Sequence, residues 1–486
     1  MFEYGWLAPA MFAGLIAFML CGFPVAFSLG ALGLSTALLA IELGYFQAGF
    51  LQALPARIFG VMSNDLLLAI PFFTFMGVVL ERSRLAEDLL ESTGQLFGPV
   101  PGGLAYAVIV VGAVLGAITG TVAASVIAMG LISLPMMMKY GYDTRLATGV
   151  IAASGTITQL IPPSLVLVVL ADHMGVSVGD LYLGAIGPSV LQVLLFCLFI
   201  AAVSLISPAK VPALPPEART LKGWPLVKLV LWGMIPSLGL IFLVLGTIFM
   251  GLATPTEAGA MGAVGALLLA LVNRRLSWTV ISEASLSTMR ITAMVIFILI
   301  GASIFGLVFH GVDGSLWIKS ILRELPGGQI GFLVFVNVFL FFVAFFLDFF
   351  EIAFIIVPLL MPMVQELGIN PIWFGVLLCI NLQTSFMHPP FGFALFYLRG
   401  IAPPSVKSSD IYWGAVPWIL LQLALVVWVI VWPESVTYFL EAPKPVDQGA
   451  VQQKLEQLKI PGLDDLPPLG GPGGLDLPAP PGSAKP

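Results

Sequence analysis

Residues 134–163 have the sequence LPMMMKYGYDTRLATGVIAASGTITQLIPP, and residues 361–390 have the sequence MPMVQELGINPIWFGVLLCINLQTSFMHPP. The landmarks of the two stretches recur at a constant offset of 227 residues, namely Pro135 and Pro362, Gly141 and Gly368, and the pairs Pro162-Pro163 and Pro389-Pro390. In both copies the apolar run turns polar just before the prolines. Prolines and polar side chains within such a run predict a broken membrane helix. A broken helix at the same place in both halves of a chain is typical of the binding site of a secondary transporter.

The composition indicates a polytopic membrane protein, because 59% of the 486 residues are hydrophobic and only 9% are charged. The apolar runs are long enough for about ten spans. The net charge of −6 is small, so we expect no nucleic-acid partner. The three cysteines, Cys21, Cys197 and Cys379, are interpreted as buried apolar residues, since no metal-ligand spacing of Cys or His is present. No nucleophile–base pair or phosphate-binding loop indicates an enzyme.

Ten candidate spans alternate with two longer apolar regions. The spans are expected at about 7–22, 24–42, 63–80, 146–170, 182–206, 227–250, 255–272, 286–309, 371–398 and 411–432. The longer regions, 103–138 and 331–365, each hold two helices of about 16 residues, and such a helix covers only about 24 Å of a hydrocarbon core about 30 Å thick. Each region is therefore predicted to be a re-entrant hairpin whose tip stops inside the membrane. The segments 146–170 and 371–398 are the broken helices.

The distribution of basic residues supports this arrangement. With the N-terminus outside, thirteen Lys and Arg residues fall on the inner side and only Arg57, Lys319 and Arg323 in the outer loops. Five spans separate the two copies, so the second is predicted to be inverted relative to the first. We expect a first repeat at 1–206, a linker at 207–226 and a second repeat at 227–435. The charged stretch 81–99 is either an amphipathic arm on the inner surface or an ordinary loop helix, and the Pro- and Gly-rich tail 441–486 is expected to be disordered.

The polar residues of the hairpins are the first candidates for a site. Gly112, Gly116 and Gly120 recur every fourth residue, a spacing that allows two helices to approach closely, and Thr119 and Thr121 then lie at the turn. Hydroxyls and carbonyls freed at such a turn are the hard oxygen ligands that Na⁺ requires, although small residues there can also serve packing alone.

The second hairpin carries carboxylates within a run of phenylalanines. Asp348 lies at the position equivalent to Thr121, and a carboxylate at this depth indicates function. Glu351 either joins it or lies near the outer surface. Glu257, in Thr254-Pro-Thr-Glu257, is a helix cap or a site residue. His388 is either structural, orienting the second Pro-Pro or binding a carbonyl, or couples protons.

Several motifs together resemble the large membrane subunit of TRAP (tripartite ATP-independent periplasmic) transporters, the DctM family. They are Gly116-Ala-Ile-Thr-Gly-Thr121, Leu134–Asp143, Ala153–Thr156, Ile161–Ser164, Leu68–Phe73, Ala253–Ala258, Phe346-Leu-Asp348 and Gly375–Pro390. The resemblance covers about residues 5–435. It implies an all-α elevator-type ion transporter with inverted repeats, two hairpins and two broken helices. It also implies a Na⁺-driven importer of small organic acids, C4-dicarboxylates among them, in the bacterial inner membrane.

The resemblance implies partners and site residues as well. The partners are a small four-helix membrane subunit of the DctQ type and a periplasmic substrate-binding protein of the DctP type, with no cofactor beyond the coupling ion. Na⁺ is expected at Thr119, Gly120, Thr121, Ser154, Gly155, Thr156, Asp348, Asn381, Thr384 and Ser385. The substrate path is expected to include Thr158, Pro162, Pro163, Gln383, His388, Pro389 and Pro390.

The chain departs from the family pattern at both tips. Val122 replaces a hydroxyl residue, and Phe349-Phe350-Glu351 replaces small residues or Pro-Thr after Asp348. These bulky residues put the usual second Na⁺ site in doubt and are compatible with a more apolar acid as substrate. A stand-alone Na⁺- or H⁺-coupled organic-anion carrier of the same fold is the alternative, and a channel or an intramembrane enzyme is a more distant one.

Overall fold

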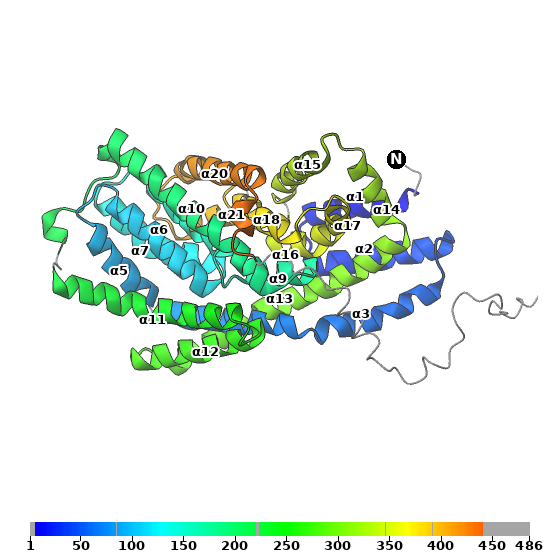
Figure 1. The fold of residues 1–486 in the computed structure, drawn as a ribbon, viewed down its shortest axis with the longest axis horizontal. Coiled ribbons are helices and arrows are strands. Elements are labelled where there is room, and N and C mark those ends of the chain that lie inside the picture. The colour runs from blue at the N-terminus through cyan, green and yellow to red at the C-terminus, as the bar shows by residue number, and fades with distance from the viewer. Residues whose placement is uncertain (1–4, 84, 220–222, 346, 391, 441–486) are drawn as a thin grey trace, which may run out of the picture. The chain divides into compact units, whose positions relative to one another are not determined.

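The computed structural model describes residues 5–83, 85–219, 223–345, 347–390 and 392–440. The chain up to Leu440 forms one compact unit, while the tail 441–486 lies outside the described residues, as do Arg84 and Lys222. The described residues contain helices and no strand, and eight of the helices are long and apolar enough to cross a membrane, or up to ten if two bent pairs each count as one span. The predicted all-α polytopic class is confirmed (Figure 1).

The helices of the two halves follow the same order. The first half contains α1 (Leu7–Leu20), α2 (Val25–Glu42), α3 (Ala53–Met62), α4 (Ala69–Arg82), α5 (Leu85–Phe97), α6 (Gly103–Thr119), α7 (Val122–Lys139), α8 (Thr144–Thr156), α9 (Leu165–Met174) and α10 (Val178–Ile206). The second contains α11 (Trp224–Phe249), α12 (Pro255–Val272), α13 (Trp278–Gly311), α14 (Gly314–Arg323), α15 (Gly328–Val343), α16 (Phe349–Glu351), the π-helical turn Ile352–Ile356, α17 (Val357–Glu366), α18 (Pro371–Ser385), α19 (Phe393–Ile401), α20 (Ser408–Val431) and α21 (Glu434–Thr437). Three of them, α3, α14 and the short α21, were not expected from the sequence.

The offset of 227 residues extends well beyond the motifs that revealed it. Shifted by this amount, the starts of α6, α7, α8, α9 and α10 fall within three residues of the starts of α15, α16, α18, α19 and α20. Helices α2 and α5 correspond in the same way to α12 and α14, and α4 corresponds to the second half of α13. The starts of these helices therefore recur at the same offset as the sequence motifs.

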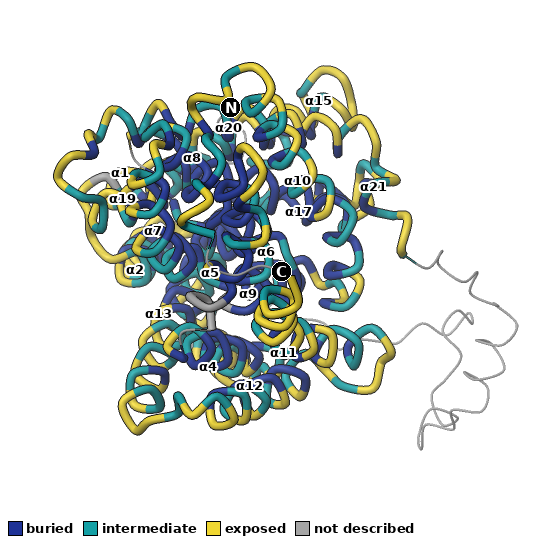
Figure 2. The backbone as a smooth tube through the Cα atoms, turned by 90° about the vertical axis from the view of Figure 1, so that its left-hand side faces the viewer, coloured by how far each residue is buried: buried dark blue, intermediate teal, exposed yellow. Residues whose placement is uncertain are grey.

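Packing divides the helices into two groups. In the first group, α13 packs against α2 and α4, and α12 packs against α4 and α11. In the second, α8 packs against α6, α7 and α20, and α18 packs against α9, α10, α15 and α20. Buried residues are dense in this second group, where every described residue from Ala147 to Leu160 is buried (Figure 2). Helices α4 and α13 also contact the second group, through α6, α9 and the turn Ile352–Ile356.

Each hairpin turns at a residue suited to the task. Helix α6 ends at Gly120, whose φ of +61° is a conformation that favours glycine. Gly116 lies against the first broken helix so closely that a Cβ built on it would be 2.9 Å from Cα of Thr158, which confirms the expected close approach. In the second hairpin, Asp348 Oδ1 accepts a hydrogen bond from the Glu351 amide, and a Glu351 carboxylate oxygen accepts one from the Asp348 amide, both at 2.9 Å. This capping box begins the second arm of the hairpin.

The same device starts α12. Thr254 Oγ1 accepts from the amide of Glu257, and the Glu257 carboxylate accepts from the amide of Thr254 at 2.8 Å. The interpretation of Glu257 as a capping residue is therefore confirmed. Glu257 lines neither of the two cavities described below.

Candidate functional site

Both broken helices are interrupted at the Pro-Pro pairs. Helix α8 ends at Thr156 and α9 begins at Leu165, while α18 ends at Ser385 and α19 begins at Phe393. The peptide bonds Pro162-Pro163 and Pro389-Pro390 are both cis. Two hydrogen bonds stabilise the first interruption. Ser189 Oγ of α10 donates to the Leu160 carbonyl at 3.3 Å, and Ser164 Oγ within the interruption donates to the Gln159 carbonyl at 2.7 Å.

The interruptions and the hairpin tips converge on a cavity of about 270 Å³, here called the tip cavity. Its described lining comes from six places: the first tip (Gly120, Thr121, Val122 and Ala123), the first break and α9 (Gln159 and Val166), α13 (Ile291 and Met294), the second tip (Asp348, Phe349 and Phe350), the second break (Phe386) and α19 (Phe393 and Tyr397). Thr121 and Asp348, equivalent in the two repeats, therefore line the same cavity. Because α13 belongs to the other packing group, the tip cavity lies between the two groups.

Uncapped helix N-termini border the tip cavity. Helices α7, α9 and α19 begin at Val122, Leu165 and Phe393, and none of the three has a side chain capping its first amides. Residues from the first two turns of each helix line the cavity. Free amides and the positive end of the helix dipole favour a bound anion. The arrangement can therefore attract negative charge although no Lys or Arg is among the described residues that line the cavity.

Gln159 adds an unsatisfied polar group to the same wall. Its side chain is 2% exposed and its Oε1 has no hydrogen-bond partner. Buried polar atoms of native proteins are nearly always paired, so this unpaired oxygen beside a cavity is available to a hydrogen-bond donor or a cation that enters the cavity. Gln159 was not among the residues predicted from the sequence.

Asp348 also lines a second cavity, of about 470 Å³, here called the access cavity. Glu351 lines it from the same hairpin, facing Phe23–Phe27 at the start of α2 and Met294 on α13. Glu351 is 7% exposed, so its carboxylate is buried at the second tip, where it lines this cavity together with Asp348. Met294 and Asp348 are common to both cavities, which are therefore neighbours.

Behind the tip cavity, buried amides join the two broken helices. Gln383 Oε1 accepts hydrogen bonds from Gln192 Nε2 of α10 at 2.6 Å and from Gln422 Nε2 of α20 at 3.3 Å. The Gln422 amide also lies 3.2 Å from Thr156 Oγ1. All four side chains are at most 1% exposed. Gln192 and Gln422 were not predicted, although a glutamine within a long apolar span is itself a signal.

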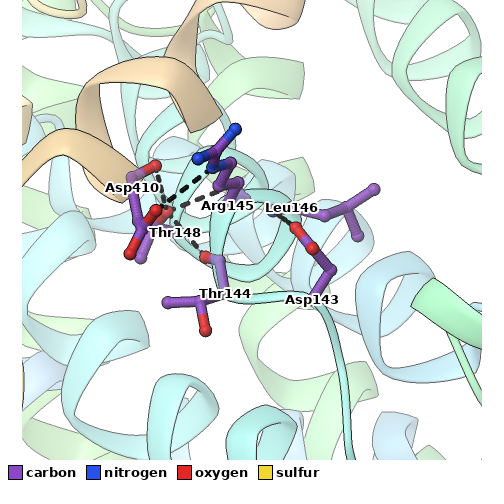
Figure 3. A network of polar contacts seen from close by, with 6 residues as sticks. All are labelled: Asp143, Thr144, Arg145, Leu146, Thr148 and Asp410. Atoms are coloured by element: carbon purple, nitrogen blue, oxygen red, sulfur yellow. Dashed lines mark hydrogen bonds and ion pairs between the residues drawn. The ribbon is translucent and has the colours of Figure 1, made fainter. Parts of the chain in front are cut away.

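A polar network at the other end of α8 fixes the same helices (Figure 3). Asp143 caps α8 by accepting from the Leu146 amide at 3.0 Å, and Arg145 Nε donates to Asp410 Oδ1 of α20 at 3.1 Å. Thr148 Oγ1 donates to the Thr144 carbonyl one turn earlier. Helix α8 is thereby held to α20 at its start and, through Thr156 and Gln422, at its end.

The predicted ion ligands fall into two sets in the structure. Gly120, Thr121 and Asp348 line the tip cavity. The described lining of that cavity does not include Ser154, Gly155, Thr156, Thr158, Asn381, Gln383, Thr384, Ser385 or the four prolines at 162, 163, 389 and 390. The hydroxyls of Thr156, Thr158 and Thr384 donate within their own helices, whereas the buried Ser154 Oγ has no partner. Thr119 ends α6, and its side chain lies outside the described residues.

The second broken helix has its own polar fastening. Asn381 Nδ2 donates to the Asn337 carbonyl of α15 at 2.8 Å, so the predicted residue Asn381 links the second broken helix to the second hairpin. Both asparagines are buried.

The side chain of His388 does not bind a carbonyl, which was one of the roles expected for it. Neither ring nitrogen has a hydrogen-bond partner, and the ring packs between Phe341 and Phe345 with centroid distances of 3.9 and 4.5 Å. The expected carbonyl contact is therefore wrong, because the side chain points into the aromatic cluster of the second hairpin.

Comparison with known proteins places these features in a family. The family model "Tripartite ATP-independent periplasmic transporter, DctM component" matches residues 12–435. The C4-dicarboxylate TRAP transporter large permease protein DctM of Pseudomonas aeruginosa is 31% identical over 399 residues, which cover 82% of this chain and 90% of that protein. The isethionate TRAP transporter permease protein DctMQ of Oleidesulfovibrio alaskensis is 29% identical over 418 residues, 86% of this chain and 64% of that protein.

A solved structure supports the fold independently of close sequence similarity. The crystal structure of the Alcanivorax borkumensis YdaH transporter aligns with a TM-score of 0.55 at 17% identity, covering 78% of this chain and 87% of that one. At this identity the likeness concerns the fold alone. With the family match over nearly the whole described chain, it follows that this multi-pass membrane protein belongs to the DctM family and is the large permease subunit of a TRAP transporter, not an enzyme.

Proposed function

We propose that this chain imports small organic acids into a bacterium, across the inner membrane, driven by an inward Na⁺ gradient. The observation that carries the proposal is the tip cavity, where both hairpin tips and both helix breaks meet. The substrate carboxylate would bind the first amides of α7 and α9, which no side chain caps, whereas the Ala394 amide of α19 already donates to the Phe386 carbonyl. Relatives named for C4-dicarboxylates and isethionate agree with an acidic substrate.

The charge of Asp348 supports the proposed Na⁺ coupling. Its carboxylate lines the cavity that would receive the anion, and like charges at short range in a low-dielectric site repel strongly. A cation held by Asp348, Thr121 and the freed carbonyls of the tips would remove this repulsion, so that anion binding would require the cation. A second cation is proposed near the unpaired hydroxyl of Ser154, beside Gly155 and Thr156. Asn381, Thr384 and Ser385 would support the corresponding position of the second repeat.

Alternating access is proposed to arise from an elevator motion. The second packing group, with the hairpins and broken helices, would move as one body against the group formed by α2, α4, α11, α12 and α13. Its internal hydrogen bonds between Gln192, Gln383 and Gln422 favour movement as a unit. The Phe23–Phe27 wall of the access cavity belongs to the side that the positive-inside count predicts to be cytoplasmic. A conformation in which the access cavity connects Asp348 to that side would be the inward-facing state.

The proposed partners are those that the TRAP family generally implies, a small membrane subunit and a periplasmic substrate-binding protein. The DctMQ relative, of which this chain spans 64%, agrees with a second membrane component. A stand-alone carrier remains the second candidate function, because the tip cavity lies within this one chain.

The test is uptake of radiolabelled organic acids by proteoliposomes that contain this chain with its small subunit and binding protein. An inward Na⁺ gradient is expected to drive uphill uptake that stops when the binding protein is left out. Uptake that persists without the binding protein would establish the stand-alone carrier. Uptake driven only by a pH gradient would refute Na⁺ coupling.

A further inference from the structure

The walls of the tip cavity differ in chemistry. On the side of the first hairpin are the glycine and threonine of the tip, the N-terminus of α7 and the unpaired amide oxygen of Gln159. On the side of the second hairpin and α19 are five aromatic residues: Phe349, Phe350, Phe386, Phe393 and Tyr397. These make up five of the fourteen residues that line the cavity. A ligand that matches both walls has one polar end and an apolar body.

Charge restricts the ligand further. Asp348 is the one charged residue among the described residues that line the tip cavity, and it lies on the aromatic side with Phe349 and Phe350. A second carboxylate on the ligand would face phenylalanine rings and this aspartate. The single cation proposed at Asp348 balances this aspartate alone, so a second ligand carboxylate would be buried without a donor or a counter-charge of its own, which is strongly unfavourable. The same wall favours an apolar body, since aromatic rings contribute a large contact area and prefer ring partners.

We propose that the permease carries monocarboxylates with an aromatic or branched apolar body, rather than C4-dicarboxylates. This assignment rests on the proposed function and specifies its substrate class. The carboxylate accepts hydrogen bonds from the first amides of α7. The Gln159 oxygen, which can only accept, faces a coupling cation bound beside that carboxylate. The apolar body packs against Phe350, Phe393 and Tyr397. The volume of about 270 Å³ lies just below the usual range for ligand pockets, which agrees with a small acid of this kind.

The first experiment measures competition in the reconstituted three-component system under an inward Na⁺ gradient. Radiolabelled phenylacetate and 4-methyl-2-oxopentanoate are the probes, and succinate and malate are the competing dicarboxylates. We expect Na⁺-dependent uptake of at least one monocarboxylate. Succinate and malate should fail to compete with it at a hundredfold excess. Na⁺-dependent uptake of the dicarboxylates alone would overturn the substrate class and leave the proposed function standing. Absence of uptake of all four acids would overturn both.

Because the binding protein also selects substrate, a second experiment measures binding to the purified permease in nanodiscs by calorimetry, without that protein. Phe350→Ala is expected to weaken phenylacetate binding about tenfold or more, since it removes one ring of the wall. Phe242→Ala, at an exposed position of α11, is the control and should leave the affinity unchanged.

Phe393→Arg places a cation on the aromatic wall, at a residue that lines the tip cavity and is 41% exposed. It is expected to create measurable succinate binding and to weaken phenylacetate binding. Equal affinity of the unmodified permease for succinate and phenylacetate would overturn the proposal, whatever the variants do.

Discussion

Thr156 and Gln383 occupy the same position in the two repeats and share one partner, because the Gln422 amide nitrogen lies 3.2 Å from Thr156 Oγ1 and 3.3 Å from Gln383 Oε1. The two broken helices are thus joined at equivalent residues through a third helix, α20. The contact is completely buried, and breaking the hydrogen bonds of a buried polar network is costly.

Gln383→Leu is therefore expected to destabilise the protein. Loss of Gln383 Oε1 leaves the buried Gln192 Nε2 without its acceptor, which costs about 1–3 kcal/mol, whereas the Gln422 amide keeps Thr156 Oγ1 as an acceptor. Thermal unfolding of the detergent-solubilised protein measures the effect. Gln365→Leu is the matched control, because Gln365 is exposed on α17, and it should leave the melting temperature unchanged. Equal melting temperatures for the two variants would show that the amide network contributes nothing.

The close contact between α6 and the first broken helix leads to a second prediction. Gly116→Ala brings a methyl group to 2.9 Å from the Cα of Thr158, and overpacking of this kind costs about 1–3 kcal/mol. The variant should therefore unfold at a lower temperature. Gly306→Ala in α13 is the control, since a Cβ there meets no atom within 4 Å, and its better helix propensity should raise stability slightly. A stable Gly116→Ala variant would show that the hairpin is free to move away from the break.

Asp348 caps the second arm of its hairpin and is proposed to hold the coupling cation, and substitutions can separate these two roles. Asparagine is as good an N-cap as aspartate, so Asp348→Asn should keep the stability of the second hairpin, whereas Asp348→Ala should lose about 0.5–2 kcal/mol. If Asp348 holds the coupling cation, both variants should lose Na⁺-driven uptake. Asp143→Asn is the control, because it keeps the cap of α8 at a residue that does not line the tip cavity. This variant should retain both its stability and its Na⁺-driven uptake. Full uptake by Asp348→Asn would remove the carboxylate from the coupling mechanism.

An ion-pair cluster joins helix α14, which precedes the second hairpin, to the end of the hairpin's second arm, α17. Glu366 at the end of α17 accepts from Lys319 Nζ at 2.6 Å and from Arg323 Nε at 2.7 Å, which ties α14 to the hairpin. These groups are partly exposed, so Glu366→Gln should cost only about 1 kcal/mol or less.

The larger effect of Glu366→Gln is expected on transport, because α14 would have to release α17 if the hairpin moves. The uptake rate of Glu366→Gln should differ from that of the unmodified protein and lose part of its salt dependence. The exposed Glu324→Gln, one residue after α14, is the control. Identical rates and salt profiles for both variants would indicate that α14 and α17 keep their contact throughout the cycle.

Much of the fold could be predicted from the sequence, because the apolar runs and the 227-residue offset can be read directly from the order of the residues. Helices α3 and α14 were missed, since Arg57, Lys319 and Arg323 interrupt their apolar pattern. At the site, Gly120, Thr121 and Asp348 could be predicted from small and polar residues in apolar surroundings. Phe386, Phe393 and Tyr397 could not, because aromatic residues that line a cavity have the same sequence pattern as those that face lipid or pack in a core.

The central claim is that this permease moves an organic acid together with Na⁺ through the tip cavity. The most direct test is the uptake of radiolabelled phenylacetate by proteoliposomes with this chain, its small subunit and its binding protein, comparing an inward Na⁺ gradient with an equal K⁺ gradient. We predict uphill accumulation with Na⁺ only, abolished by Asp348→Asn in a protein of unchanged melting temperature. Accumulation that is equal in K⁺, or that survives Asp348→Asn in full, would contradict the account.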